Sequence, residues 1–343
     1  MDAKKKIIDS LEILRIRDIQ SGEKFSALAY SKAIKELKKL DTITNEKDVE
    51  DLPGIGKQIK LKIKEIFETG ELKAASEAKK DLSIDLYIDL LNVYGIGPVK
   101  AKELIQKNKI TSIANLRQNQ DLLNEKQKLG LKYYEDALER IPYEEMKLHE
   151  AKIMETIKAP IEATIVESYR RGAETSGDID VLIKIPADFT KKQQKETLES
   201  LVKAYTHDKY IVDVLALGDK KCMAFVKLEN KARRLDLLIT PEDEYPYALL
   251  YFTGSDDFNV AFRKYALSKG YTMNEHIMKP KTDAKEVPPM KTEKDIFHFL
   301  GLVYKEPVER INENSVVQKE AKKLTMSEAM KSKKGTRNKN KTK

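Results

Sequence analysis

The sequence is poor in the residues that build disulfides, zinc sites and membrane spans. Its 343 residues include one cysteine, Cys222, no tryptophan and four scattered histidines. A single cysteine excludes an intramolecular disulfide and any zinc site built from several cysteines. No segment approaches the roughly 18 consecutive apolar residues that a membrane span needs, and the N-terminus lacks the apolar core of a signal peptide. These absences predict an intracellular protein without a membrane anchor.

Charged residues, in contrast, are abundant. They make up 35% of the chain, and 64 lysines and arginines against 56 acidic residues give a net charge of +8. The length suffices for two or more compact units with at least one sizeable core. A basic excess of this size is compatible with a polyanionic partner such as nucleic acid.

The stretch with the most chemical information is Ser168–Lys184, written SYRRGAETSGDIDVLIK. A polar loop runs into an alternating segment that predicts a strand, with Asp178, Asp180 and Leu182 on one face. Two carboxylates on adjacent same-face positions repel each other, and a set of hard oxygen ligands suits Mg²⁺ or Mn²⁺. The alternative for an isolated DxD is an edge strand with a solvated acidic face.

A short element with two glycines occurs twice, as LPGIG at residues 52–56 and VYGIG at residues 93–97. Each copy lies between predicted helices and opens a basic helix, which is the helix-hairpin-helix pattern. Its glycines let the backbone approach a phosphate, and the amides of the next helix point at the anion. The alternative is an ordinary tight turn. Two copies favour sequence-independent DNA-backbone binding, and the predicted contact residues are Gly54, Gly56, Lys57, Lys60, Gly95, Gly97 and Lys100.

The segment YRRGAETSGDIDVL resembles the branch of the nucleotidyltransferase superfamily that contains the family X DNA polymerases, particularly those of the polymerase beta type. The resemblance covers nearly the whole chain. It implies a multidomain α and α/β fold in which helical domains precede a palm with a mixed β-sheet and an α+β closing subdomain. The expected parts are a lyase-like domain (1–80), a DNA-binding subdomain (81–140), the palm (141–242), a nucleotide-selecting subdomain (243–314) and a basic disordered tail (315–343).

The same resemblance assigns a polymerase site. It implies that Asp178 and Asp180 hold two Mg²⁺ ions, for which Mn²⁺ can substitute, and that Asp236 in RRLDLLI holds the catalytic ion, steadied by Arg234. The implied nucleotide-binding residues are Arg140, Ser168, Arg171, Gly177, Tyr251, Phe252, Gly254, Asp256 and Asn259. Arg234 and Arg263 are implied DNA contacts. Two departures stand out: Glu167 occupies a position where the family has glycine, and His276 one where it has tyrosine.

Residues 1–80 resemble the family's 5′-deoxyribose phosphate lyase domain, aligning at LPGIG and at Ala29–Ala33. The resemblance places the Schiff-base lysine at Lys62 among other lysines of the same helix, with Tyr30 and Lys32 in the lyase pocket. A family phosphate-binding lysine is replaced by Gln58. The alternative is a solvated basic face that only touches DNA.

Together these features predict a DNA-directed DNA polymerase that fills short gaps in base excision repair, with lyase activity. Its expected substrates are gapped or nicked DNA and deoxynucleoside triphosphates. We also expect a monomer in the nucleus or another DNA-containing compartment, and a monovalent cation at the hairpin turns. We expect neither a phosphopeptide-binding module before the lyase-like domain nor a phosphoesterase domain after residue 315.

Two other functions share parts of this pattern. A nucleotidyltransferase that adds nucleotides to RNA would share the DxD pair but has no need of paired hairpins or of the YFTGSD segment at residues 251–256. A non-catalytic binder of DNA ends or gaps would keep the hairpins, and its support is Glu167.

Overall fold

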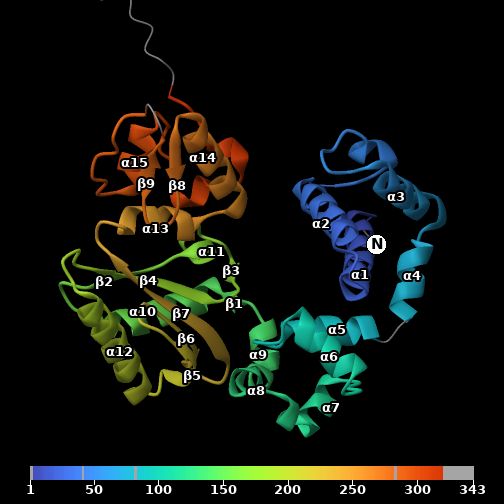
Figure 1. Cartoon of the computed structure of the whole chain (residues 1–343), viewed down its shortest axis with the longest axis horizontal. Coiled ribbons are helices and arrows are strands. Elements are labelled where there is room, and N and C mark those ends of the chain that lie inside the picture. The colour runs from blue at the N-terminus through green and yellow to red at the C-terminus, as the bar shows by residue number, and fades with distance from the viewer. Residues whose placement is uncertain (1–2, 41, 81–82, 282–283, 320–343) are drawn as a thin grey trace, which may run out of the picture. The chain divides into compact units, whose positions relative to one another are not determined.

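The computed structural model describes residues 3–40, 42–80, 83–281 and 284–319. The chain forms two compact units that divide between Leu138 and Glu139. Each unit has its own secondary structure and its own hydrophobic cores (Figure 1).

The described residues of unit 1, Met1–Leu138, form helices and turns without strands. The helices are α1 (Ala3–Ser21), α2 (Lys24–Lys39), η1 (Glu46–Val49), α3 (Lys57–Thr69), α4 (Lys73–Lys80), α5 (Ser83–Asn92), α6 (Pro98–Gln106), α7 (Ile113–Gln118), η2 (Gln120–Leu122), α8 (Glu125–Lys132) and α9 (Tyr134–Leu138). The two hairpin motifs lie immediately before α3 and α6, where Gly56 and Gly97 are the N-cap residues.

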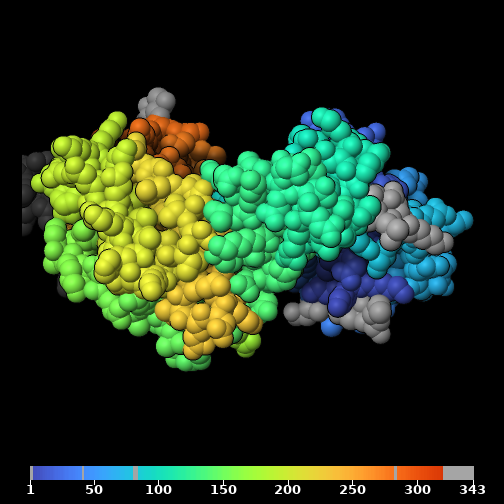
Figure 2. All heavy atoms as spheres, turned by 90° about the horizontal axis from the view of Figure 1, so that it is seen from below, coloured from blue at the N-terminus to red at the C-terminus, as the bar shows by residue number. Residues whose placement is uncertain are grey.

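Two hydrophobic clusters are formed by the described residues of unit 1. The first joins α1, α2 and α3, and Ile7, Leu11 and Leu14 contribute a fully buried stripe at helical spacing. The second joins α5, α6, α7 and α8, and Leu90 and Leu104 are fully buried in it. The side chains of α5 to α9 form one continuous packed body, coloured teal in Figure 2.

Unit 2 is built on a mixed five-stranded sheet of order β2-β4-β7-β6-β5. The β4–β7 pair is parallel, and the other neighbours are antiparallel. The elements of this part are β1 (Ile141–Pro142), α10 (Tyr143–Thr156), β2 (Glu162–Ile165), α11 (Glu167–Arg170), β3 (Thr175–Ser176), β4 (Ile179–Ile185), α12 (Lys191–His207), β5 (Ile211–Leu217), β6 (Lys221–Lys227) and β7 (Ala232–Pro241).

Strand alternation gives this sheet two different faces. Ile179, Val181 and Ile183 of β4 join Leu235 and Leu237 of β7 in the large core that α10 and α12 cover (Figure 1). The intervening residues point to the opposite face, where Leu182 packs with Val166 and with Ala248 of the helix that follows β7, α13 (Tyr245–Thr253). Asp178, Asp180 and Asp236 belong to this second face, as the period of two predicts.

The rest of unit 2 is α+β. It contains α13 (Tyr245–Thr253), α14 (Asp256–Ser268), β8 (Tyr271–Met273), β9 (Met278–Pro280), α15 (Glu293–Phe299), η3 (Pro307–Glu309) and η4 (Glu313–Ser315). The predicted fold class is therefore confirmed. Among the described residues, no helix is long and apolar enough to cross a membrane.

The predicted start of the tail at residue 315 is too early. Gln318 forms a β-bridge with Leu302, and the backbone of Lys319 donates to the carbonyl of Gly301 at 2.9 Å. Paired backbone groups of this kind place 315–319 in the fold. The remainder of the predicted tail, 320–343, lies outside the described residues.

Candidate active site

The three candidate metal ligands come from two adjacent parallel strands. Asp180 of β4 lies in register with Asp236 of β7, and Asp178 immediately precedes β4. The Asp180 side chain is also hydrogen-bonded to Asp178. The structure thus brings together carboxylates that are separated by more than fifty residues in the sequence.

Two of these carboxylates form ion pairs with basic side chains. Arg234 donates to Asp178, and Lys221 Nζ lies 2.8 Å from Asp236 Oδ2. Lys221, at the start of β6, was not predicted from the sequence as a partner of Asp236. Arg234, which was expected to steady Asp236, donates to Asp178 in the structure. In this state, no group of three or more His, Cys, Asp or Glu side chains in the described part of the chain has the arrangement of a metal site.

The electrostatics of the group nevertheless fit a cation. Burial and the nearby charges of Asp178 and Asp236 raise the pKa of Asp180 to about 8. Asp236 is only 7% exposed, and its Oδ1 atom is buried with no hydrogen-bond partner among the described residues. A buried acceptor beside repelling carboxylates is the donor set that a hard divalent ion prefers.

Three of the predicted nucleotide-binding residues lie around the short strand β3, between α11 and β4. Ser168 Oγ donates to Ser176 Oγ at 3.1 Å. Arg140 donates through Nε to Thr175 Oγ1 and through a terminal nitrogen to the Thr175 carbonyl, both at 2.7 Å. Gly177 follows directly, so Arg140, Ser168 and Gly177 all lie around the short strand β3.

Glu167 takes over the backbone role of the glycine expected at its position. Its φ is +56°, a left-handed conformation that costs a residue with a side chain more than it costs glycine. Its carboxylate lies 3.6 Å from the guanidinium of Arg171. Burial and the charges of Asp256 and Asp178 raise the pKa of Glu167 despite this cation. The carboxylate of Glu167 therefore lies within electrostatic range of Asp178 and Asp256 as well as Arg171.

The YFTGSD motif connects α13 with α14. Tyr251 and Phe252 pack edge to face at 5.1 Å between ring centroids, and Asn259 Nδ2 donates to the Tyr251 carbonyl at 2.6 Å. Gly254 has a φ of +67°, a conformation that residues with a side chain rarely adopt. A Cβ atom added there would lie 3.0 Å from the guanidinium of Arg171. Only glycine allows this close approach. The structure brings Arg171 to this turn, since it also donates to the Thr253 carbonyl.

A buried ion-pair network that the sequence did not predict supports this turn. Glu293 at the start of α15 accepts from Arg170 at 2.8 and 3.1 Å and from Arg310 at 2.5 Å. Arg310 is fully buried, and Arg170 also donates to Thr253 Oγ1. Burial by itself would raise the pKa of Glu293, but the two guanidinium groups outweigh it and lower this pKa. Arg170 and Glu293 lie 123 positions apart in the sequence, and no sequence pattern links the three residues.

The two hairpins share a backbone geometry. Gly54 and Gly95 have φ of +81° and +83°. The second hairpin is held by α8, because Gln127 Nε2 donates to the Gly95 carbonyl at 2.9 Å. A Cβ atom added to Gly54 in the first hairpin would lie 3.6 Å from Lys32 Cβ.

The candidate lyase residues are distributed over two helices. Tyr30 of α2 is buried, whereas Lys32 is exposed. Lys57, Lys60 and Lys64 line one side of α3 around a cavity of about 350 Å³. Lys62 belongs to the same helix but is not among the residues that line this cavity.

The fold and the site together define a class of protein. A mixed sheet with three carboxylates, beside a loop of small residues and arginines, is the architecture of a nucleotidyltransferase palm. A family model described as DNA polymerase beta palm matches residues 140–242, and one described as DNA polymerase beta thumb matches 248–311. The model of the fingers domain of DNA polymerase lambda matches 89–138, and a helix-hairpin-helix domain matches 2–72.

Curated relatives agree with these matches. The chain is 31% identical over 330 residues to DNA polymerase lambda of Rattus norvegicus, covering 89% of this chain and 56% of that protein. It is 31% identical over 314 residues to DNA polymerase lambda of Arabidopsis thaliana, covering 84% and 58%. The chain thus spans somewhat more than half the length of these relatives. It belongs to the family X DNA polymerases, as the sequence predicted.

Proposed function

We propose that this protein is a DNA-directed DNA polymerase that fills short gaps during repair of the base-excision type. The observation that carries the proposal is the register of Asp180 with Asp236 on adjacent parallel strands. Family membership supports it. The proposed substrates are gapped or nicked DNA and deoxynucleoside triphosphates, and the proposed setting is a DNA-containing compartment.

The carboxylates supply the metal sites. Asp178 and Asp180 would hold two Mg²⁺ ions, with Mn²⁺ able to replace them, and Asp236 would complete the catalytic site. Bound ions of this kind lower the pKa of a primer 3′-hydroxyl and neutralise the leaving pyrophosphate. Arg234 and Lys221 partly neutralise Asp178 and Asp236 in the structure, and Lys221 contacts Oδ2 of Asp236, which leaves Oδ1 for a cation. Asp236 also accepts the hydroxyl proton.

The remaining groups orient the substrates. Arg140, Ser168 and Arg171 bind the triphosphate, with Gly177 leaving room for it, and the ring pair Tyr251–Phe252 contacts the sugar at the Gly254 turn. Asp256 and Asn259 contact the nascent base pair. Their contribution is positioning, which lowers the entropic barrier of the bimolecular step.

DNA is bound through its backbone by unit 1 and through basic side chains of unit 2. Amides at Gly54, Gly56, Gly95 and Gly97 face phosphates, and monovalent cations bind at these turns. Lys57, Lys60 and Lys100 add positive charge beside them, while Arg234 and Arg263 of unit 2 contact the template–primer duplex.

The decisive experiment is extension of a primer across a one-nucleotide gap with a 5′-phosphate, in Mg²⁺, with each deoxynucleotide in turn. Template-matched addition by the wild type that disappears in Asp236→Ala would support the polymerase. Val260→Ala, an exposed residue of α14, is the matched control and should retain activity. A wild type that binds the gap but adds nothing with Mg²⁺ or Mn²⁺ would overturn the proposal.

We further propose that unit 1 removes 5′-deoxyribose phosphate through a Schiff base at Lys62, with Tyr30 and Lys32 in the pocket. Borohydride reduction on an incised abasic site should trap a covalent DNA adduct in the wild type but not in Lys62→Ala. Lys64→Ala on the same helix, whose amine lies 3.7 Å from Glu68, is the control. Trapping that persists in Lys62→Ala would remove the assignment.

A second candidate function, a binder of DNA gaps without efficient catalysis, is favoured by one observation. Glu167 pairs with Arg171, a proposed triphosphate ligand. Glu167→Gly restores a residue suited to the φ of +56° and frees that arginine. If Glu167 limits nucleotide binding, this variant should bind a complementary triphosphate about tenfold more tightly at a gap, which corresponds to about 1.4 kcal/mol. Equal affinity in the two proteins would show that Glu167 is harmless.

A further inference from the structure

Two consecutive arginines of β7 point to opposite faces of the sheet. Arg234 lies on the carboxylate face and donates to Asp178. Arg233 points to the face that α10 covers, where it is 3% exposed. A buried guanidinium is costly unless its donors are satisfied by a well-placed anion. The partners of Arg233 therefore indicate which part of the structure this buried charge holds in place.

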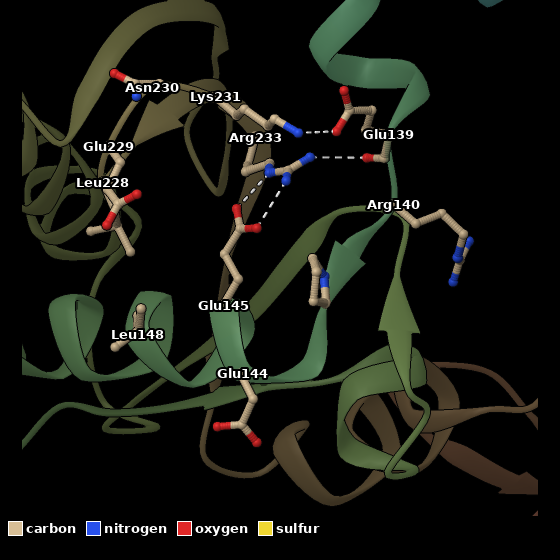
Figure 3. A pocket seen from close by; sticks show the side chains of 11 residues that line it. Glu139, Arg140, Glu144, Glu145, Leu148, Leu228, Glu229, Asn230, Lys231 and Arg233 are labelled. Carbon is tan, nitrogen blue, oxygen red and sulfur yellow. Dashed lines mark hydrogen bonds and ion pairs between the residues drawn. The ribbon is translucent and has the colours of Figure 1, made fainter.

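Arg233 makes a two-pronged ion pair and one further hydrogen bond (Figure 3). Its Nε and one terminal nitrogen lie 2.6 and 2.9 Å from the carboxylate oxygens of Glu145 on α10. Its other terminal nitrogen donates to the backbone carbonyl of Glu139 at 3.0 Å. The fixed fork of arginine satisfies both partners at once, which a lysine amine does not.

Glu139 is the first residue of unit 2 and precedes Arg140 directly. Its side chain pairs with Lys231, next to a pocket of about 430 Å³ that Arg233 and Glu145 help to line. Arg140 points away from the Arg233–Glu145 pair (Figure 3) and toward Thr175. On its other side, Ile141 pairs with Ser176. The backbone of Arg140 is thus fixed on both sides, by Arg233 before it and by the β1–β3 pair after it.

We propose that Arg233, locked by Glu145, is a positioning residue that holds the Glu139 carbonyl and thereby presents Arg140 to the nucleotide triphosphate. The inference rests on the proposed polymerase function and on Arg140 as a phosphate ligand. Ordering Arg140 during folding removes part of the entropy that nucleotide binding would otherwise cost. The side chain of Arg233 lies on the face of the sheet opposite Asp236 and binds Glu145 and the Glu139 carbonyl, so its effect on the reaction passes through Arg140.

The test removes the ion pair without leaving a buried charge. Arg233→Met combined with Glu145→Met replaces both partners with apolar side chains of similar length, which buried ion pairs often tolerate. Thermal unfolding checks that this variant is folded. In steady-state filling of a one-nucleotide gap, we expect the KM for the complementary deoxynucleotide to rise about tenfold while kcat changes less than about threefold. Lys231→Met, which removes only the side-chain partner of Glu139, should leave KM within about twofold.

The same change is then made in an Arg140→Ala background. If Arg233 acts through Arg140, the paired Met substitutions should raise KM no further there, which is the non-additivity expected of coupled residues. An undiminished increase, or a KM equal to the wild type in the first experiment, would overturn the positioning role while leaving the polymerase intact. Absence of gap filling by the wild type would instead be a failure of the proposed function, on which this inference depends.

Discussion

The two faces of the palm sheet use neighbouring residues of the same strands in opposite ways. On the face covered by α10 and α12, Leu235 and Leu237 are fully buried in the core, and Arg233 has an ion-pair partner. On the other face, Asp236 is buried with an unsatisfied oxygen, and Asp180 is held among like charges. The first face stabilises the fold, and the second stores electrostatic repulsion that a cation would relieve. The comparison teaches that stability and chemistry alternate residue by residue along β7.

The largest effect should come from the carboxylate face. Asp236→Asn keeps the shape of the side chain but removes the charge proposed to hold the catalytic ion and accept the proton. We expect gap filling to fall by about 10³-fold or more, with an unfolding temperature within a few degrees of wild type. A variant that retains a tenth of the activity would show that Asp236 is not essential.

The next effect concerns the residue beside it on the opposite face. Leu237→Ala leaves a cavity in a fully buried site and should lower the free energy of unfolding by about 3 kcal/mol. Activity per folded molecule should stay within about fivefold of wild type. Denaturant unfolding and gap filling are measured on the same samples, so that stability and activity can be compared. An equally large loss of stability and of activity in Leu237→Ala would show that the two faces do not differ in this way.

A pH-dependent effect is expected from His149 on α10. Burial lowers the pKa of His149 to about 4, although the carboxylate of Glu145 acts in the opposite direction. The Nδ1 atom of His149 lies 2.8 Å from the Tyr210 hydroxyl, and Glu145 is also paired with Arg233. The unfolded chain takes up the proton near pH 6.5, before the folded protein does. This site therefore loses stability as the pH falls from 6.5 to 4, by at most about 3 kcal/mol.

Unfolding of the wild type and of His149→Gln at pH 7 and pH 4.5 measures this contribution. The variant should lose less stability than the wild type on acidification. Parallel losses in the two proteins would exclude His149 as the cause.

The smallest effect is a gain in stability. Asp180→Asn removes one of the repelling carboxylates, so in a chelator the free energy of unfolding should rise by about 1 kcal/mol even though activity is lost. Thermal unfolding in the chelator measures this gain. Ile183→Val, on the core face of the same strand, should lower stability by about 1 kcal/mol. A loss of stability in both variants would contradict the contrast between the faces.

Much of the architecture followed from local patterns. The period-two segment after Gly177 predicted β4 and the common face of Asp178 and Asp180, and the paired glycine motifs predicted the turns before α3 and α6. The pairings across the chain could not be read in the same way. The contacts of Lys221 with Asp236 and of Glu293 with Arg170 and Arg310 join segments whose side chains carry no periodic signal.

The string RRLDLLI marks the division between the two kinds of information. By itself the sequence determined that Arg233 and Arg234 would lie on opposite faces of a strand, because side chains alternate. Only the tertiary structure decided what each face meets: Glu145 and the carbonyl of Glu139 for Arg233, and Asp178 for Arg234. The physical reason is that alternation is a property of the local backbone, whereas the partner of a charge depends on which distant segments pack against the sheet.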